Sequence, residues 1–235
     1  MTGHRSRLLL VIALTVALTV GCGGGGKQLT VFAASSLTDV LTDLAGAHRP
    51  AGGPDIVKVF GGSNHLAAQL RDGAPADVFV TADADLIAGL AIVGSPAPVA
   101  SNYLVAAVPT DNPGGVTAST DLTRGDLRLA VCAAGVPCGN ATAGRFGDLP
   151  ADTEEPSVRA VLSRLILGEA DLGVVYATDL VSSKGEVVSP WPQEPMCPCV
   201  VYVAVALNGR GVDFVDFLVG STAQNIFANH GFSTP

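Results

Sequence analysis

Apolar and polar residues alternate along the chain in an order that predicts strands followed by helices. The apolar run 29–34 has the length of a buried strand, and from Ser36 onward apolar residues recur at the spacing of one helix face. The same succession recurs in two further units, with strands at 56–60 and 77–81 and helices that begin at Ser63 and Asp83. Three strand–helix units in a row predict a mostly parallel sheet with helices on both faces.

The rest of the chain continues this alternation after a loop-like stretch. We expect strands at 127–132, 172–176 and 200–207, and helices at 139–146, 157–167, 214–218 and 223–228. The segments 102–108 and 201–207 are apolar and similar in character, so each is expected to be a hinge strand that runs from one lobe into the other. The pattern predicts an α/β fold of two lobes, with lobe 1 at residues 28–102 plus 206–235 and lobe 2 at residues 103–205.

The beginning of the chain has the pattern of an export signal. A basic start with Arg5 and Arg7 precedes an apolar run at 8–20, which is shorter than the roughly 20 residues that a membrane-spanning helix needs. Gly21 and Cys22 follow, and then come four glycines that form a flexible tether. The mature protein is therefore expected to work outside the cytoplasm.

The junction at Cys22 resembles a bacterial lipoprotein signal, in which cleavage before the cysteine accompanies attachment of a diacylglyceryl group to its sulfur. We expect a signal peptide at residues 1–21, lipidation of Cys22 and a Gly-rich tether at residues 22–27. Such signals usually carry leucine where this chain has Thr19, so an ordinary secretory signal that is cut nearby stays open as the alternative.

Charge narrows the range of partners. The 235-residue chain has 13 basic and 21 acidic residues and a net charge of −8, and removal of the signal takes away two of the arginines and no acid. An acidic mature protein is a poor partner for nucleic acid, which requires a basic face, and for anionic lipid. Membrane contact is therefore expected through the lipid anchor alone.

The cysteines predict at least one disulfide. Apart from Cys22, the chain has Cys132, Cys138, Cys197 and Cys199, an even number that suits an oxidising compartment. We favour a disulfide between Cys132 and Cys138 that clips a loop, with the other two paired to each other or free. A zinc site is the alternative, although the Cys-Pro-Cys spacing is tighter than zinc ligands usually have.

Two serines lie where an open α/β sheet usually binds its ligand. Ser36 and Ser63 each follow a predicted strand and open a helix, and the carboxyl ends of parallel strands line a crevice. Backbone N–H groups at helix N-termini attract anions there, and serine hydroxyls add further donors. The alternative is that each serine only caps its helix, which would stabilise that helix by about 1 kcal/mol.

Several motifs in the same order resemble the periplasmic molybdate-binding proteins of ABC importers. They cover essentially all of residues 28–233 and are Val-Phe-Ala-Ala-Ser-Ser-Leu-Thr at 31–38, Gly-Ala-Pro-Ala-Asp-Val-Phe at 73–79, Gly-Val-Pro-Cys-Gly at 135–139, Ser-Val-Arg at 157–159, Leu-Gly-Val-Val-Tyr-Ala-Thr-Asp at 172–179 and Ile-Phe-Ala-Asn-His-Gly-Phe at 226–232. The resemblance implies the two-lobed periplasmic-binding-protein fold, with a mostly parallel, helix-flanked sheet in each lobe and crossing hinge strands.

The resemblance also implies a set of ligand-binding residues. In that family two serines, two backbone amides and a tyrosine hydroxyl hold the oxyanion, and the matching positions here are Ser36, Ser63, Cys138, Val158 and Tyr176. Cys138 stands where the family often has alanine, but an amide donor does not depend on its side chain. The segment between Cys138 and Val158 is short for the family, so the resemblance does not imply the contour of the cleft mouth.

The implied function is extracytoplasmic capture of molybdate and tungstate for delivery to an ABC permease, by a lipid-anchored monomer without a cofactor or catalytic activity. Both ions are dianions that accept hydrogen bonds and donate none, and a site made only of donors suits them. Sulfate has the same donor preference, so a sulfate- or other anion-binding protein is the main alternative. A serine hydrolase is a remote one, because Ser63 and His65 lie close but no G-x-S-x-G elbow is present. A lipid-anchored adhesin or sensor domain is a third alternative.

Overall fold

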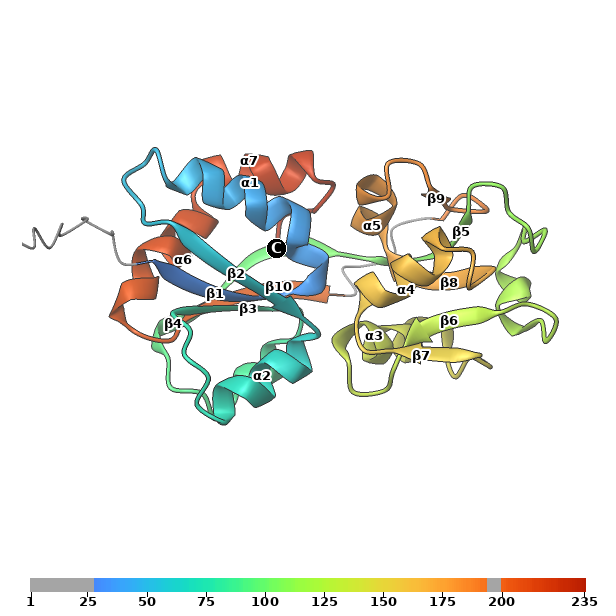
Figure 1. Ribbon diagram of the computed structural model, residues 1–235, viewed down its shortest axis with the longest axis horizontal. Coiled ribbons are helices and arrows are strands. Elements are labelled where there is room, and N and C mark those ends of the chain that lie inside the picture. Colours follow the sequence, from blue (N-terminus) through green and yellow to red (C-terminus); the bar gives the residue numbers. More distant parts are fainter. Residues whose placement is uncertain (1–27, 194–199) are drawn as a thin grey trace, which may run out of the picture.

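The computed structural model describes residues 28–193 and 200–235, and these form two α/β lobes that lie side by side (Figure 1). Each lobe is built around a five-stranded sheet with helices packed against it. The expected signal peptide, lipidated Cys22 and tether lie outside the described residues, as do Cys197 and Cys199. Within the described residues, no helix combines the length and apolar character needed to cross a membrane.

The sheet of lobe 1 has the strand order β2-β1-β3-β10-β4. The strands are β1 (Leu29–Ala34), β2 (Ile56–Gly61), β3 (Val78–Thr81), β4 (Val93–Asn102) and β10 (Val200–Ala206). The first three in chain order run parallel, whereas β10 runs antiparallel to both β3 and β4. The expectation of a mostly parallel sheet therefore holds for the first three strand–helix units, and the sheet as a whole is mixed.

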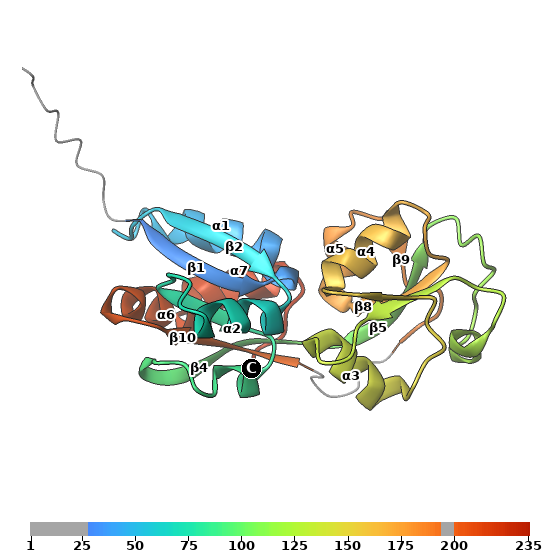
Figure 2. The same cartoon turned by 60° about the horizontal axis from the view of Figure 1, so that its bottom comes forward.

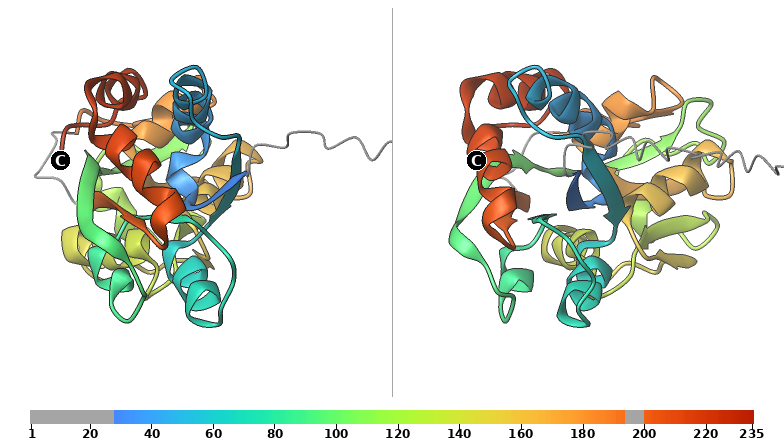
Figure 3. Two further views of the ribbon diagram at one scale, coloured as in Figure 1. Left: turned by 90° about the vertical axis from the view of Figure 1, so that its left-hand side faces the viewer. Right: turned by 60° about the vertical axis from the view of Figure 1, so that its left-hand side comes forward.

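Helices cover both faces of this sheet, as the sequence predicts. They are α1 (Thr38–His48), α2 (Ser63–Arg71), α6 (Val212–Val219) and α7 (Ser221–Asn229), with short 3-10 helices η1 (Ser35–Leu37), η2 (Ala84–Ile87) and η4 (Gly209–Gly211). Helices α1 and α7 pack together on one side, and α2 lies on the other (Figure 3). Alternate residues of β1 separate accordingly, because Val31 belongs to one apolar cluster and Phe32 to the other.

The sheet of lobe 2 has the order β7-β6-β8-β5-β9 and mixes directions in the same way. Its strands are β5 (Leu104–Pro109), β6 (Leu129–Cys132), β7 (Thr153–Glu155), β8 (Leu172–Tyr176) and β9 (Val187–Val188), and its helices are α3 (Pro137–Phe146), α4 (Val158–Ile166), α5 (Ala177–Ser182) and the 3-10 helix η3 (Ser119–Thr123). Strands β6, β7 and β8 are parallel, and β5 runs antiparallel to β8.

The chain crosses from lobe 1 to lobe 2 between β4 and β5, which are separated by Tyr103 (Figure 2). This crossing lies inside the segment 102–108 that the sequence predicts as a hinge strand. The second prediction is wrong, because β10 stays within lobe 1, where it pairs with β3 and β4. The return crossing therefore precedes Val200.

The predicted lobe boundary at 205/206 consequently misplaces the strand Val200–Ala206. Its residues are buried from both sides, since Tyr202 packs in the large apolar cluster that extends into both lobes and Val203 packs in the cluster on the other face of the lobe 1 sheet. Such a strand is apolar throughout, and its pattern does not tell which of two sheets it joins. Strand β4 also begins at Val93, earlier than the apolar pattern indicates, because Pro96 and Pro98 interrupt the alternation.

Candidate functional site

A small cavity lies between the lobes and brings together all five residues that the sequence analysis selected. The space open to the centre of a water molecule is about 20 Å³, little more than one such molecule needs. The lining residues are Ala34, Ser35, Ser36, Gly61, Gly62, Ser63 and Ala82 from lobe 1 and Val136, Pro137, Cys138, Ser157, Val158 and Tyr176 from lobe 2. None of these residues is charged.

The fold brings these residues together because each follows the carboxyl end of a strand. Ser36 lies in η1 directly after β1, and Ser63 begins α2 just beyond β2. In lobe 2, Cys138 is the second residue of α3 after β6, Val158 is the first residue of α4 after β7, and Tyr176 ends β8. All five residues are at most 3% exposed, so the site is buried between the lobes.

Neither serine caps a helix, so the alternative interpretation from the sequence is wrong. The N-cap of α1 is Leu37 and that of α2 is Gly62, and neither makes a side-chain cap bond. The hydroxyl of Ser36 instead lies 2.8 Å from the hydroxyl of Tyr202, and the Oγ of Ser63 accepts a hydrogen bond of 3.2 Å from the backbone N–H of Ala82.

Three α-helices begin at the cavity wall and turn backbone N–H groups toward it. These helices are α2, α3 and α4, whose first residues are Ser63, Pro137 and Val158. The first N–H groups of a helix have no partner inside the helix, and the helix dipole adds a partial positive charge at that end. The donors available at the cavity are therefore hydroxyls and amides, a combination that favours a small anion.

The guanidinium of Arg159 lies next to this site but is engaged in ion pairs. One pair, at 2.8 Å, joins it to Asp39 of lobe 1, and another, at 3.1 Å, joins its Nε to Asp179. Asp179 also accepts a hydrogen bond of 2.9 Å from the backbone N–H of Tyr176. Complete burial raises the pKa of Asp179 to about 6 because desolvation outweighs the attraction of Arg159.

A disulfide joins Cys132 to Cys138, as the sequence analysis favours. It ties the end of β6 to the second residue of α3, across a sequence separation of 6. The loop it closes folds tightly, since a Cβ on Gly139 would lie only 2.1 Å from the carbonyl oxygen of Ala133. The backbone N–H of Cys138 is therefore held by a clipped loop on one side and by the first turn of a helix on the other.

The lobes touch each other around the cavity, so the structure represents a closed form. A Cβ on Gly62 of lobe 1 would lie 2.5 Å from the carbonyl oxygen of Pro156 in lobe 2, which leaves room only for glycine. Across the hinge, the side-chain amide of Asn102 donates a hydrogen bond of 2.8 Å to the hydroxyl of Thr178.

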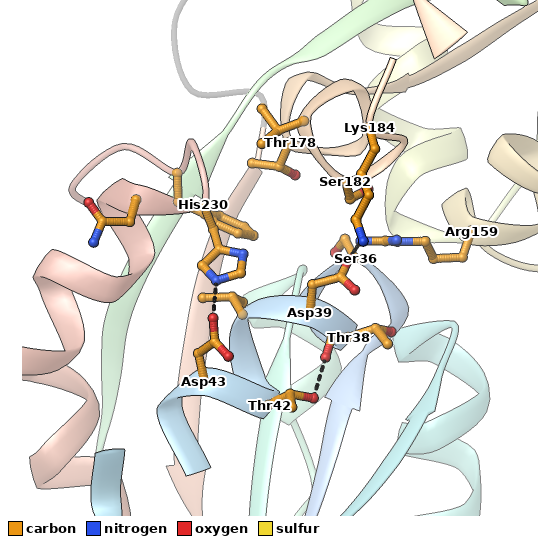
Figure 4. A pocket seen from close by; sticks show the side chains of 14 residues that line it. Ser36, Thr38, Asp39, Thr42, Asp43, Arg159, Thr178, Ser182, Lys184 and His230 are labelled. Atoms are coloured by element: carbon orange, nitrogen blue, oxygen red, sulfur yellow. Dashed lines mark hydrogen bonds and ion pairs between the residues drawn. The ribbon is translucent and has the colours of Figure 1, made fainter. Parts of the chain in front are cut away.

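A second, larger cavity of about 460 Å³ lies on the other side of Ser36. Figure 4 shows its walls, with Asp39, Asp43 and His230 on the lobe 1 side and Arg159 and Lys184 on the lobe 2 side. Two contacts join groups of its walls, one between Asp39 and Arg159 and one between Asp43 and His230, both at 2.8 Å. This cavity offers acceptors as well as donors, so it suits a bare anion less well than the small cavity does.

Tyr202 and Asn102 are not among the residues that the sequence singles out. Both lie in strands of lobe 1, and their side chains are buried with hydrogen-bond partners on other elements. A tyrosine in the middle of an otherwise aliphatic strand is the one available signal, because a buried hydroxyl needs a partner. The pattern does not tell that Ser36, 166 residues away, is that partner.

Comparisons with known proteins agree with this architecture. Residues 29–233 match the family model described as bacterial extracellular solute-binding protein. The molybdate-binding protein ModA of Mycobacterium tuberculosis is 34% identical, over 96% of this chain and 97% of the relative, and the Escherichia coli ModA is 33% identical, over 94% and 95%. The structure of the periplasmic molybdate-binding protein of Azotobacter vinelandii superposes with a TM-score of 0.74 at 22% identity, over 88% of this chain and 99% of that one. The chain thus belongs to the family of bacterial extracellular solute-binding proteins and is a relative of ModA.

Proposed function

We propose that this protein captures molybdate outside the cytoplasm and delivers it to an ABC permease. The observation that carries the proposal is the small closed cavity that Ser36, Ser63, Cys138, Val158 and Tyr176 line together. The names of the relatives, which are molybdate-binding proteins at 33–34% identity over nearly the whole chain, support the same ligand.

The chemistry of the cavity fits a fully ionised oxyanion. Molybdate carries no proton at neutral pH, so every oxygen needs a donor and none needs an acceptor. The hydroxyls of Ser36, Ser63 and Tyr176 and the amides of Cys138 and Val158 are the proposed donors. A protonated oxyanion such as hydrogen phosphate would need an acceptor, and no carboxylate is among the residues that line the cavity.

Tungstate has the same charge and a similar size, so we propose that the site takes it as well. Sulfate is the alternative ligand, because it is also a bare dianion. Only the size of the cavity distinguishes molybdate and tungstate from sulfate, since metal–oxygen bonds are longer than sulfur–oxygen bonds. The close contact between Gly62 and Pro156 limits how far the lobes can adjust, and such rigidity allows discrimination by fit.

The remaining parts of the proposal concern the location and state of the protein. Lipidation of Cys22 would hold the protein at the outer face of the cell membrane, and the tether at residues 22–27 would let both lobes reach the permease. We propose a monomer that binds its ligand without transforming it, because the cavity supplies donors and no nucleophile–base pair.

Thermal unfolding of the mature chain without its lipid tests the ligand. Molybdate at 1,000 times its dissociation constant should stabilise the protein by about 4 kcal/mol, which corresponds to a rise in Tm of roughly 8–16 °C for a chain of this size. Tungstate should act similarly, and sulfate, phosphate and chromate should have little effect. A rise with sulfate alone would favour the alternative, and no rise with molybdate or tungstate would refute the proposal.

Variants of the two serines test the site. Ser36→Ala and Ser63→Ala should each weaken molybdate binding by roughly 10- to 100-fold, the value of a hydrogen bond to a charged group. Ser119→Ala, which changes an exposed serine of lobe 2, is the matched control and should bind as the wild type does. Unchanged affinity in both cavity variants would mean that the ligand binds elsewhere.

A further inference from the structure

The two serine hydroxyls of the small cavity differ in how their protons are fixed. Ser63 accepts a hydrogen bond from the backbone N–H of Ala82, a group that can only donate. The proton of Ser63 is therefore left to point at a ligand. Ser36 is paired with the hydroxyl of Tyr202 at 2.8 Å, and either of these two hydroxyls could be the donor.

Asn102 resolves this ambiguity. The backbone N–H of Tyr103 donates to the Oδ1 of Asn102 at 2.9 Å, and because a main-chain N–H cannot accept, it fixes which end of the amide is oxygen. The Nδ2 then faces the opposite way, where it donates to Thr178 at 2.8 Å. Against the larger effect of burial, a hydrogen bond with Asn102 lowers the pKa of the Tyr202 phenol, which is the effect of a donor, so it comes from the Nδ2 end of the amide.

The direction of each bond in the chain follows from this orientation. Since Nδ2 of Asn102 is a donor, the oxygen of Tyr202 must accept from it, and the proton of Tyr202 must go to another acceptor. The Oγ of Ser36 lies within reach at 2.8 Å, and the tyrosine side chain is fully buried. Burial also raises the pKa of Tyr202, so this phenol keeps its proton throughout the physiological pH range.

We propose that Tyr202, oriented by Asn102, is a positioning residue that makes the Ser36 hydroxyl a hydrogen-bond donor toward the bound oxyanion. Because Tyr202 occupies one lone pair of Ser36 and does not take its proton, the hydroxyl of Ser36 is left to donate into the cavity, as that of Ser63 is. Together the two serines favour an oxyanion without a proton, because each already uses one of its two lone pairs and directs its own proton at the ligand. The inference rests on the proposed function and deepens it, since it names the groups that select an unprotonated anion.

The same chain of hydrogen bonds spans both lobes. Asn102 ends β4 in lobe 1, and Thr178 lies in α5 of lobe 2, on the wall of the larger cavity that it shares with Ser36 (Figure 4). The contact with Thr178 therefore adds to the hold of the Tyr103 N–H on Asn102 in this closed form.

Tyr202→Phe tests this role because it removes the hydroxyl and keeps the ring that packs edge-on against Tyr176 and Phe232. We expect the variant to bind molybdate about 10-fold more weakly by titration calorimetry, with the loss of one oriented donor to a charged ligand as the cause. Tyr103→Phe, which removes the hydroxyl of a partly buried tyrosine outside the cavity, is the matched control and should bind as the wild type does.

A double-mutant cycle separates positioning from general support of the fold. If Tyr202 acts through Ser36, the variant Ser36→Ala/Tyr202→Phe should bind within twofold of Ser36→Ala alone. Tyr202→Phe should also bind hydrogen phosphate better relative to molybdate, because both lone pairs of Ser36 are then free to accept a proton. The inference would be overturned if the two losses of affinity multiply in the double variant, or if Tyr202→Phe binds molybdate as tightly as the wild type does. In either case, binding of molybdate by the wild-type protein would still support the proposed function.

A neutron structure of the wild-type protein tests the same point without any substitution. The inference requires the deuteron of Tyr202 to lie between its oxygen and the Oγ of Ser36, with the deuteron of Ser36 directed into the small cavity. A deuteron of Ser36 that points at Tyr202 would overturn the inference. If the wild type fails to bind molybdate, the proposed function is wrong. A neutron structure of the protein without ligand would still decide the direction of the hydrogen bond between Tyr202 and Ser36.

Discussion

The disulfide between Cys132 and Cys138 offers a perturbation whose size can be worked out from the structure. The bond closes a short loop, with a sequence separation of 6, that ends at the proposed amide donor of Cys138. For a loop of about 7 residues, the restriction of the unfolded chain corresponds to about 2.4 kcal/mol. The double variant Cys132→Ala/Cys138→Ala should therefore unfold at a Tm that is lower by roughly 5–10 °C.

The same variant tests whether Cys138 contributes its backbone and not its side chain. It keeps the N–H of residue 138 but frees the loop before α3, so the loop must be ordered when the ligand binds. That ordering free energy can reach at most the value of the constraint, about 2.4 kcal/mol, so the affinity for molybdate should fall by several-fold and by no more than roughly 50-fold.

Calorimetric titration and thermal unfolding of the oxidised protein and the variant give both quantities. The variant is preferable to a reducing agent, because a reductant would also act on Cys197 and Cys199. The single variant Cys138→Ala should lose a similar amount of affinity, since either substitution breaks the bond. A loss far beyond 50-fold would refute the reasoning by showing direct side-chain contact, and an unchanged Tm would show that the disulfide constrains nothing.

Two further predictions concern closure and pH. Gly62→Ala places a Cβ 2.5 Å from the carbonyl oxygen of Pro156, so it should hinder closure and weaken molybdate binding at least 10-fold in titration calorimetry. The control Gly46→Ala, whose Cβ meets open space, should bind normally. Equal affinities of the two variants would mean that closure does not bring Gly62 and Pro156 together. Asp179 has a pKa raised to about 6 by burial, so below about pH 4 it is protonated in both states and between about pH 4 and 6 it ionises more readily when unfolded. The contribution of Asp179 to stability therefore falls by up to about 3 kcal/mol as the pH rises through that window. In chemical unfolding, Asp179→Asn should become more stable relative to the wild type over the same window. Parallel pH curves for the two proteins would contradict the raised pKa of Asp179.

The part of the fold that local patterns predict correctly is the succession of strand–helix units. Ser36 and Ser63 follow strands β1 and β2 as expected, because apolar spacing and the start of a helix are local properties of the sequence. The assignment of Val200–Ala206 to the wrong lobe has the opposite cause. A strand buried on both faces reads as uniformly apolar, and its neighbours β3 and β4 are fixed by tertiary packing.

The sequence predicts which residues form the candidate site, but it does not predict how their hydroxyls are oriented. The motifs name Ser36, Ser63, Cys138, Val158 and Tyr176, and the structure brings these five to one cavity. Local spacing suggests helix caps for the serines, and tertiary contacts replace that role with partners from distant strands. The orientation of each hydroxyl depends on such partners, so it could not be read from positions along the chain.

Anomalous diffraction at the molybdenum edge, from crystals grown with molybdate, tests the central claim most directly. The account predicts one strong peak in the small cavity, with the oxygens of the ion within hydrogen-bond distance of the hydroxyls of Ser36, Ser63 and Tyr176 and the N–H groups of Cys138 and Val158. A peak in the larger cavity beside Asp39 and His230, or none in protein that is saturated with molybdate, would contradict it.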